Sequence, residues 1–180
     1  MTDWNAQPAH CRPQWLSLLV GMALAAAPAS ATVLISQVYG GGGNGGAPLK
    51  NDFIELFNNG ASAVDLSGWS VQYASASGTS WQKTALGGMI QPGQYLLVQQ
   101  AAGTNTAAPA LPAADFSGSI AMGASNGKVA LVKNNTALNC SSNCLPNADI
   151  ADLVGYGSAG GFEGSGAAPA ASNTQAVLRG

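Results

Sequence analysis

The feature that most constrains this chain is a series of short apolar runs, each closed by Gly, Pro, Asn or Ser. The clearest runs are residues 33–39, 53–58, 69–74, 95–99, 128–133 and 153–156, and weaker ones are residues 81–86, 119–122 and 176–179. Runs of this length between turn residues are typical of β-strands. No amphipathic helical pattern of useful length follows residue 31. The pattern therefore predicts an all-β fold, an antiparallel sandwich or barrel.

Two turn sequences indicate how neighbouring strands are joined. Gln91-Pro92-Gly93-Gln94 has Pro and Gly at the central positions that a type II turn favours. The dipeptide Asn126-Gly127 is typical of a tight hairpin turn. It predicts that residues 119–123 pair with residues 128–132.

The alternation of side chains along a strand predicts which residues share a face. Ile54 and Leu56 fall on one face of their strand, whereas Phe53 and Glu55 fall on the other. Trp69 opens the third run, and we expect it to enter the core.

The first 31 residues are typical of a cleaved secretory signal. Arg12 precedes an uncharged run rich in Leu and Ala at residues 15–27, and Ala29-Ser30-Ala31 fits the small-x-small rule for signal peptidase. The run is shorter than the ~20 apolar residues that a membrane-spanning helix needs. We therefore expect residues 1–31 to be a signal peptide and the protein to be secreted, either outside the cell or in the cell envelope. The alternative is an uncleaved membrane anchor.

Composition excludes several classes of function. Removing residues 1–31 from the 180-residue chain leaves 149 residues, enough for one domain with a core. Only 8% of the whole chain is charged, so a strong basic patch and tight nucleic-acid binding are not expected. The single histidine, His10, lies in the predicted signal. The rest of the chain therefore lacks the residues for Ser–His–Asp or Cys–His catalysis and the commonest zinc ligand.

Cys140 and Cys144 are the two cysteines that remain once the signal, with Cys11, is removed. An even pair in an oxidising compartment favours a disulfide. A zinc site would need two further ligands, and a redox site would favour the Cys-x-x-Cys spacing. We expect a structural disulfide between Cys140 and Cys144, and no metal site.

A glycine tract at residues 40–45 formally contains a G-x-G-x-x-G pattern after a β-type run. Dinucleotide binding would also need a helix that begins at the last glycine, whereas Pro48 and another β-type run follow. We interpret the tract as a flexible loop between two strands. No bound cofactor and no catalytic residue are expected.

The acidic residues offer weak site candidates. Asp52 and Glu55 are three residues apart, so on a strand they face opposite sides. We interpret these two residues and Asp65 as strand-end and sheet-surface charges. Asp149 and Asp152 receive the same interpretation.

Several aromatic residues could instead form a binding face for a sugar or a peptide. The candidates are Trp69, Tyr73, Trp81, Tyr95 and Tyr156. Aromatic residues of small sandwiches more often pack in the core. Trp81 fits the strand pattern least, which makes it the best surface candidate.

The loop composition indicates one domain. Residues 101–114, rich in Ala, Thr and Pro, predict a long surface loop. We expect a sandwich core at residues 32–157, followed by a Gly- and Ala-rich loop and a final strand of the same domain at residues 158–180. Because the chain stops just after that strand, we expect it to be a fragment of a longer protein.

Taken in order, these segments resemble the lamin tail domain in its secreted bacterial form. The similarity runs from residue 33 to residue 179, and its matching segments are residues 38–45, 51–58, 66–73, 91–98, 127–132 and 152–157. The resemblance implies an immunoglobulin-like antiparallel β-sandwich. It also implies a non-catalytic binding or targeting module and not an enzyme.

The resemblance leaves the partner unknown, and both a protein and an extracellular polymer stay open. In secreted bacterial proteins such domains often precede a nuclease, so one alternative is an accessory domain of an extracellular endonuclease. A second alternative is a structural protein of the envelope or matrix that associates through strand edges.

Overall fold

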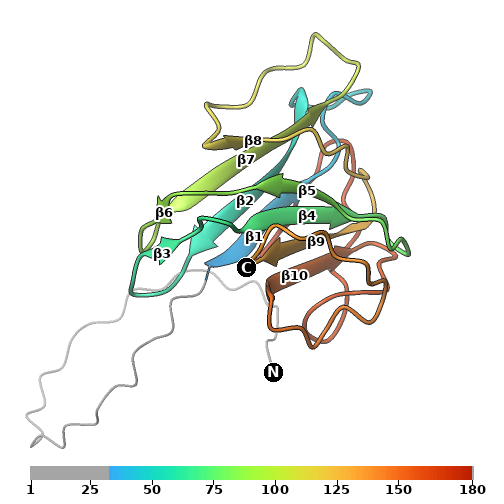
Figure 1. Ribbon diagram of the computed structural model, residues 1–180. Coiled ribbons are helices and arrows are strands. Elements are labelled where there is room, and N and C mark those ends of the chain that lie inside the picture. Colours follow the sequence, from blue (N-terminus) through green and yellow to red (C-terminus); the bar gives the residue numbers. More distant parts are fainter. Residues whose placement is uncertain (1–32, 180) are drawn as a thin grey trace, which may run out of the picture.

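The computed structural model describes residues 33–179, which form two stacked β-sheets (Figure 1). The larger sheet has the strand order β11 (Val177–Leu178), β1 (Val33–Tyr39), β2 (Asn51–Asn58), β7 (Tyr95–Ala102) and β8 (Phe116–Ser117). The second sheet has the order β10 (Ile150–Tyr156), β9 (Gly127–Val132), β4 (Ser70–Ala74) and β5 (Gln82–Ala85). A two-stranded sheet joins β3 (Val64–Asp65) to β6 (Met89–Ile90). All named strands pair antiparallel except β7 with β8, which confirms the predicted all-β sandwich.

The predicted signal peptide lies outside the described residues, as do Thr32 and Gly180. Residues 33–179 contain no helix that is long and apolar enough to cross a membrane.

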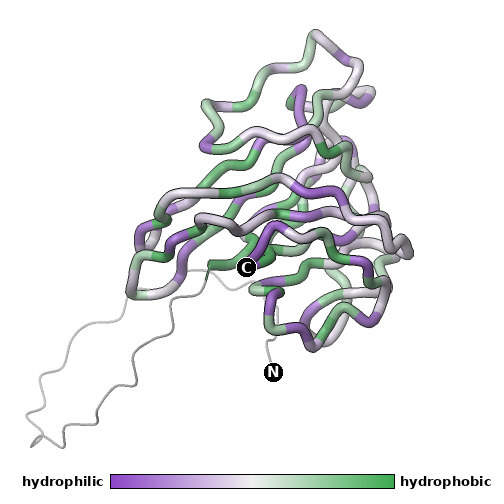
Figure 2. The backbone as a smooth tube through the Cα atoms, viewed as in Figure 1, coloured by the Kyte–Doolittle hydropathy of each residue, from purple (hydrophilic) through white to green (hydrophobic). Residues whose placement is uncertain are grey.

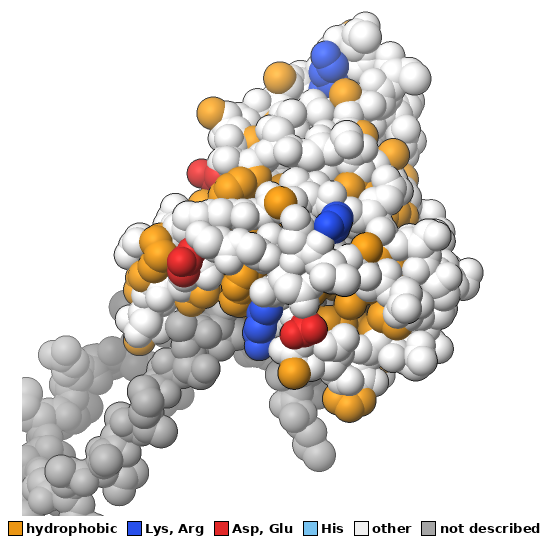
Figure 3. Space-filling model, in the orientation of Figure 1, with side chains coloured by type: hydrophobic (Ala, Val, Ile, Leu, Met, Phe, Trp, Pro, Cys, Tyr) orange, Lys and Arg blue, Asp and Glu red, His pale blue; other side chains and the backbone are white. Residues whose placement is uncertain are grey.

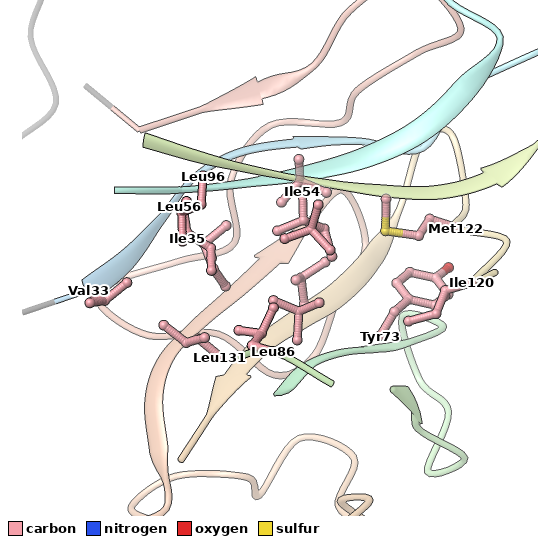
Figure 4. Close-up of a cluster of buried hydrophobic side chains, with 14 of the residues drawn as sticks. Val33, Ile35, Ile54, Leu56, Tyr73, Leu86, Leu96, Ile120, Met122 and Leu131 are labelled. Atoms are coloured by element: carbon pink, nitrogen blue, oxygen red, sulfur yellow. The ribbon is translucent and has the colours of Figure 1, made fainter. Parts of the chain in front are cut away.

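The core forms between the facing sides of the two sheets (Figure 4). Ile54 and Leu56 share one face of β2, as the alternation predicts, and both are fully buried there, whereas Glu55 is half-buried on the outer face. Val71 of β4 meets them from the second sheet, and Trp69 is half-buried against the same cluster. Figure 2 shows hydrophobic stretches within the strands of both sheets, with hydrophilic residues interspersed.

The second sheet is covered on both faces. Ala130 and Val132 of β9 belong to a second apolar cluster on the side away from the main core, together with Trp81 and Cys144. All six residues of β9 are buried. Burial on both faces explains why this strand reads as a nearly continuous apolar run instead of an alternating one.

The predicted hairpin at Asn126-Gly127 is wrong. Neither residue has a positive φ, which a type I′ turn requires, and Gly127 instead begins β9 opposite Tyr156 of β10. Residues 119–122 do not form a strand either. Ile120 and Met122 are buried in the core, but their backbone N–H groups donate to side chains of distant strands, Gln100 and Asp52.

The turn at residues 91–94 is confirmed. The N–H of Gln94 donates to the carbonyl of Gln91 at 3.0 Å, and Gly93 has a φ of 73° at the third position of the turn.

The glycine tract is a packed junction and not a flexible loop. Residues 40–43 are buried. A Cβ atom at Gly42 would overlap the backbone where β2 begins, so only glycine fits this close approach. The N–H of Gly42 donates to the carboxylate of Asp52 at 2.8 Å, which anchors the tract to β2.

Candidate functional site

A groove of about 520 Å³ lies at the side of the sandwich where β1 and β10 approach each other. We call it the edge groove; its walls are residues 35–38 of β1, residues 153–155 of β10, residues 162–169, and residues 177–179 at β11. Its volume falls within the ~300–1,000 Å³ of typical ligand pockets. It is therefore the first place to look for a binding function.

Two β-bulges shape the edge groove. The register of β1 with β2 shifts between Ile35 and Gln37, and that of β10 with β9 shifts between Ile150 and Asp152. A bulge bends its strand and turns side chains to new directions. Asp152, at the second bulge, accepts a hydrogen bond at 2.7 Å from the N–H of Ile35 at the first. One carboxylate thus joins the edges of the two sheets.

Arg179 completes this junction from the segment after β11. Its Nη2 donates to both carboxylate oxygens of Asp152 at 2.7 Å. Its Nε donates to the carbonyl of Ile35 at 3.0 Å, and its backbone N–H donates to the carbonyl of Ser36 at 2.9 Å. Charge-assisted bonds of this kind are the stronger class of hydrogen bond. Arg179 therefore holds β11 against β1 and ties both to β10.

The loop after β10 forms the outer wall of the groove. The N–H of Glu163 donates to the carbonyl of Leu153 at 3.0 Å, and the N–H of Ala168 donates to the carbonyl of Gly155 at 2.8 Å. These bonds cover part of the β10 edge. Between them the loop carries Gly, Ser and Ala at residues 164–167, and these small side chains leave the space open.

The electrostatics of the groove centre on Glu163. Burial raises the pKa of this carboxyl group, and the negative charge of Asp152 and a hydrogen bond between the two carboxyl groups raise it further. The hydrogen bond from the Leu153 backbone and the charge of Arg179 act in the opposite direction. The groove is therefore lined by the carboxyl group of Glu163 and the guanidinium group of Arg179 among apolar walls, and the carboxylate of Asp152 is buried behind them.

The acidic residues that the sequence singles out do not converge. Asp65 is exposed and accepts a hydrogen bond from the N–H of Ser67. Glu55 accepts one from Ser36 Oγ at 2.7 Å on the outer face of the larger sheet. Asp52 lies at the start of β2, as its interpretation as a strand-end charge predicts, on the opposite face from Glu55, and it is only 5% exposed.

Asp52 joins two distant loops. Its carboxylate accepts hydrogen bonds at 2.8 Å from the N–H groups of Gly42 and Met122. Burial raises the pKa of Asp52 to about 6, although both of these hydrogen bonds favour the charged form. Asp52 has a structural role here, because its carboxylate is enclosed by the backbone.

Asp149 and Asp152 also differ from one another. Asp149 is exposed in the turn before β10, as its interpretation as a surface charge requires. Asp152 is only 3% exposed, so the surface interpretation is wrong for this residue. Arg179 and Glu163, the other charged residues of the groove, were not candidates from the sequence. A useful signal was that each is an isolated charge in a nearly uncharged segment.

The predicted disulfide between Cys140 and Cys144 is present. It closes a short loop over Lys128, whose Nζ donates to the carbonyls of Gly78 at 2.8 Å and Ser141 at 3.0 Å. Lys128 is fully buried and lies 5.2 Å from the ring centre of Trp81, and burial lowers the pKa of its amine. The loop thus seals one face of the second sheet.

Trp81 is not the surface aromatic residue. It is only 6% exposed and its Nε1 donates to the carbonyl of Cys140 at 2.9 Å. Tyr95 is instead 56% exposed and stacks on Phe57 with ring centres 4.4 Å apart. This pair lies on the outer face of the larger sheet, away from the edge groove.

The surface carries little charge. Figure 3 shows a few charged side chains on one face, most of them isolated and one basic group beside an acidic one, between hydrophobic and uncharged polar groups. In residues 33–179 no group of three or more His, Cys, Asp or Glu side chains is placed to hold a metal ion. The chemistry available at the groove is therefore apolar contact, hydrogen bonding and charge pairing.

Comparison with known proteins identifies a family for most of the chain. The model of the Lamin Tail Domain matches residues 26–158, which is more than half of the chain. A comparison with curated proteins finds no match.

Proposed function

The chain belongs to the lamin tail domain family, a family of non-enzymatic immunoglobulin-like domains, and we propose that it is a secreted binding module whose edge groove takes up part of a partner. The observation that carries the proposal is the groove itself. It combines a ligand-sized volume, mostly apolar walls and a small set of charged groups, as binding sites do.

The rigidity of the groove floor supports a binding role. Asp152 and Arg179 lock the two sheet edges together, so β1 and β10 present a preformed surface. The groove floor therefore has little to reorganise when a partner binds, and a preorganised site loses less free energy on binding. In the outer wall, residues 164–166 are exposed and can adjust to the ligand.

Secretion is supported by the signal-like residues 1–31 and by the disulfide, which persists in oxidising compartments. N-terminal sequencing of protein from the culture medium should begin at Thr32.

Attachment to a nuclease stays a prediction from the bacterial resemblance. Reading the gene beyond Gly180 tests it, and the chain alone should leave plasmid DNA intact in the presence of Mg²⁺ or Ca²⁺.

The binding role is tested by selecting peptides on the immobilised secreted chain and blocking the groove. Ala167→Trp places a large side chain in the groove wall, and Ala107→Trp makes the same change in the exposed loop between β7 and β8. Selected peptides should bind the parent and Ala107→Trp equally, and bind Ala167→Trp at least ~10-fold more weakly. Equal binding to all three proteins, or no selected peptide, would contradict the proposal.

A further inference from the structure

We infer that the edge groove recognises a primary ammonium group on an aliphatic stem, as in a lysine side chain of a partner protein, with Glu163 as the carboxylate that pairs with it. This inference rests on the proposed function and names the chemistry of its ligand. It follows from the balance of charges in the groove and from the nature of the walls.

The charges in the groove do not cancel. With all three groups ionised, Asp152 and Glu163 contribute two negative charges and Arg179 contributes one positive charge. Arg179 already directs Nη2 to both oxygens of Asp152 and Nε to the carbonyl of Ile35. Asp152 and Arg179 therefore form an ion pair, and Glu163 has no salt bridge of its own among residues 33–179.

The position of Glu163 favours a charged ligand from outside. Asp152 is buried behind the junction, whereas Glu163 is exposed and lines the groove. Its carboxyl group lies beside a second carboxyl group and partly out of water, where an incoming cation interacts more strongly than at an open surface. An anionic ligand would instead meet the negative charge of Glu163, which disfavours phosphate and carboxylate ligands.

The walls favour a long aliphatic stem. The half-buried side chains of Val154, Phe162, Ala167 and Val177 and the exposed side chain of Leu178 provide apolar contact around the charged end. A lysine side chain has this character, because its four-carbon stem can lie on an apolar surface while its ammonium group reaches a polar one. The same stem without the ammonium group, as in norleucine, is the matched control ligand.

The probes are three pentapeptides with an acetylated N-terminus and an amidated C-terminus. Valine and glycine flank the central residue, which is lysine, norleucine or glutamate. Titration of the secreted full chain, followed by amide chemical shifts, gives the affinity and the place of binding. The lysine peptide should bind at the groove about 10-fold more tightly than the norleucine peptide, as a hydrogen bond to a partly buried carboxylate allows. The glutamate peptide should bind most weakly.

Glu163→Gln should make the lysine and norleucine peptides bind equally. Asp149→Asn removes the same charge from the exposed turn before β10 and should leave the 10-fold preference intact. Because Glu163 is exposed, its replacement should not prevent folding, and an unchanged urea midpoint checks this.

The preference should also depend on pH. The charged groups that act on Glu163 are Asp152 from β10 and Arg179 from the segment after β11, and the net effect raises the pKa of Glu163. Glu163 therefore loses its charge at a higher pH than an ordinary glutamate, so the preference for lysine should disappear as the pH falls toward that value.

Three results would overturn the inference: equal binding of the lysine and norleucine peptides by the parent, an unchanged preference in Glu163→Gln, or no groove binding by any probe. If selected peptides still bind at the groove in any of these cases, the proposed function stands and only the lysine specificity fails. If no ligand of any kind binds there, both fail.

Discussion

Replacing Arg179 with methionine tests the junction that builds the edge groove. Methionine keeps an unbranched stem of similar length but removes every hydrogen bond that the guanidinium group makes to Asp152 and Ile35. The carboxylate of Asp152 would then stay buried with no cation beside it, and would keep the N–H of Ile35 and the carboxyl group of Glu163 as hydrogen-bond partners. The result should be a less stable domain.

The expected magnitude follows from the exposure of the two side chains. Removing one partner of a fully buried ion pair costs about 3–5 kcal/mol. Here the Asp152 side chain is 4% exposed, but that of Arg179 is 32% exposed, so water replaces part of the lost interaction. We expect Arg179→Met to lower the free energy of unfolding by about 2–3 kcal/mol. For a domain of this size that corresponds to a Tm lower by roughly 4–12 °C.

Urea unfolding followed by tryptophan fluorescence measures this change. Lys133→Met is the matched control, because Lys133 is exposed directly after β9 and, among the described residues, its Nζ donates to the carbonyl of Ala148 alone, at 3.2 Å. It should change stability by less than about 0.5 kcal/mol. Adding Asp152→Asn to Arg179→Met should cost less than the sum of the two single changes, with an interaction of about 1–3 kcal/mol. The junction does not hold the sheet edges together if Arg179→Met changes the free energy of unfolding no more than Lys133→Met does. The same conclusion follows if the effects of Arg179→Met and Asp152→Asn simply add.

Three further changes test other parts of the fold by urea unfolding. Burial raises the pKa of Asp52 to about 6, so the folded state binds the proton more tightly than the unfolded chain does. As the pH rises from 3.8 to above 6, the free energy of unfolding of the parent should therefore fall by on the order of 3 kcal/mol relative to that of Asp52→Asn. Replacing Cys140 and Cys144 together with serine should cost about 2 kcal/mol, the entropy that so short a closed loop removes from the unfolded chain. Gly42→Ala should cost about 3 kcal/mol or more because its Cβ would overlap the backbone of β2, whereas Gly45→Ala meets nothing within 4 Å and should be tolerated.

Each of these expectations has an outcome that would contradict it. Parallel pH profiles for the parent and Asp52→Asn would show that the carboxyl group is not desolvated. A stability of the parent that is unchanged by reductant would show that the disulfide does not contribute. Equal effects of alanine at Gly42 and Gly45 would show that the tract is as open as its composition suggests.

Much of the sandwich could be predicted from local pattern. The alternation predicted that Ile54 and Leu56 share a face of β2, and Pro92 and Gly93 identified the type II turn, because strand pleat and turn geometry are local properties. Residues 119–122 show the limit of such reasoning. Their alternation resembles a strand, but Ile120 and Met122 bond to side chains that lie 20 and 70 residues away.

The candidate site could not be predicted for a similar reason. Asp152 and Arg179 are 27 residues apart, and Ile35 is 117 residues from Asp152, so only the tertiary fold brings them together. The bulges that aim these groups leave no clear signal in the sequence. Glu163 was visible only as one acidic residue in a Gly- and Ala-rich loop.

The central claim is that this lamin tail domain binds its partner through the edge groove. The most direct measurement is a map of amide chemical shifts on titration of the secreted chain with a selected peptide. Shifts should concentrate in residues 35–38, 153–155 and 162–169, which line the groove. Shifts concentrated instead around Phe57 and Tyr95, on the outer face of the larger sheet, would place binding on the aromatic pair and contradict the claim.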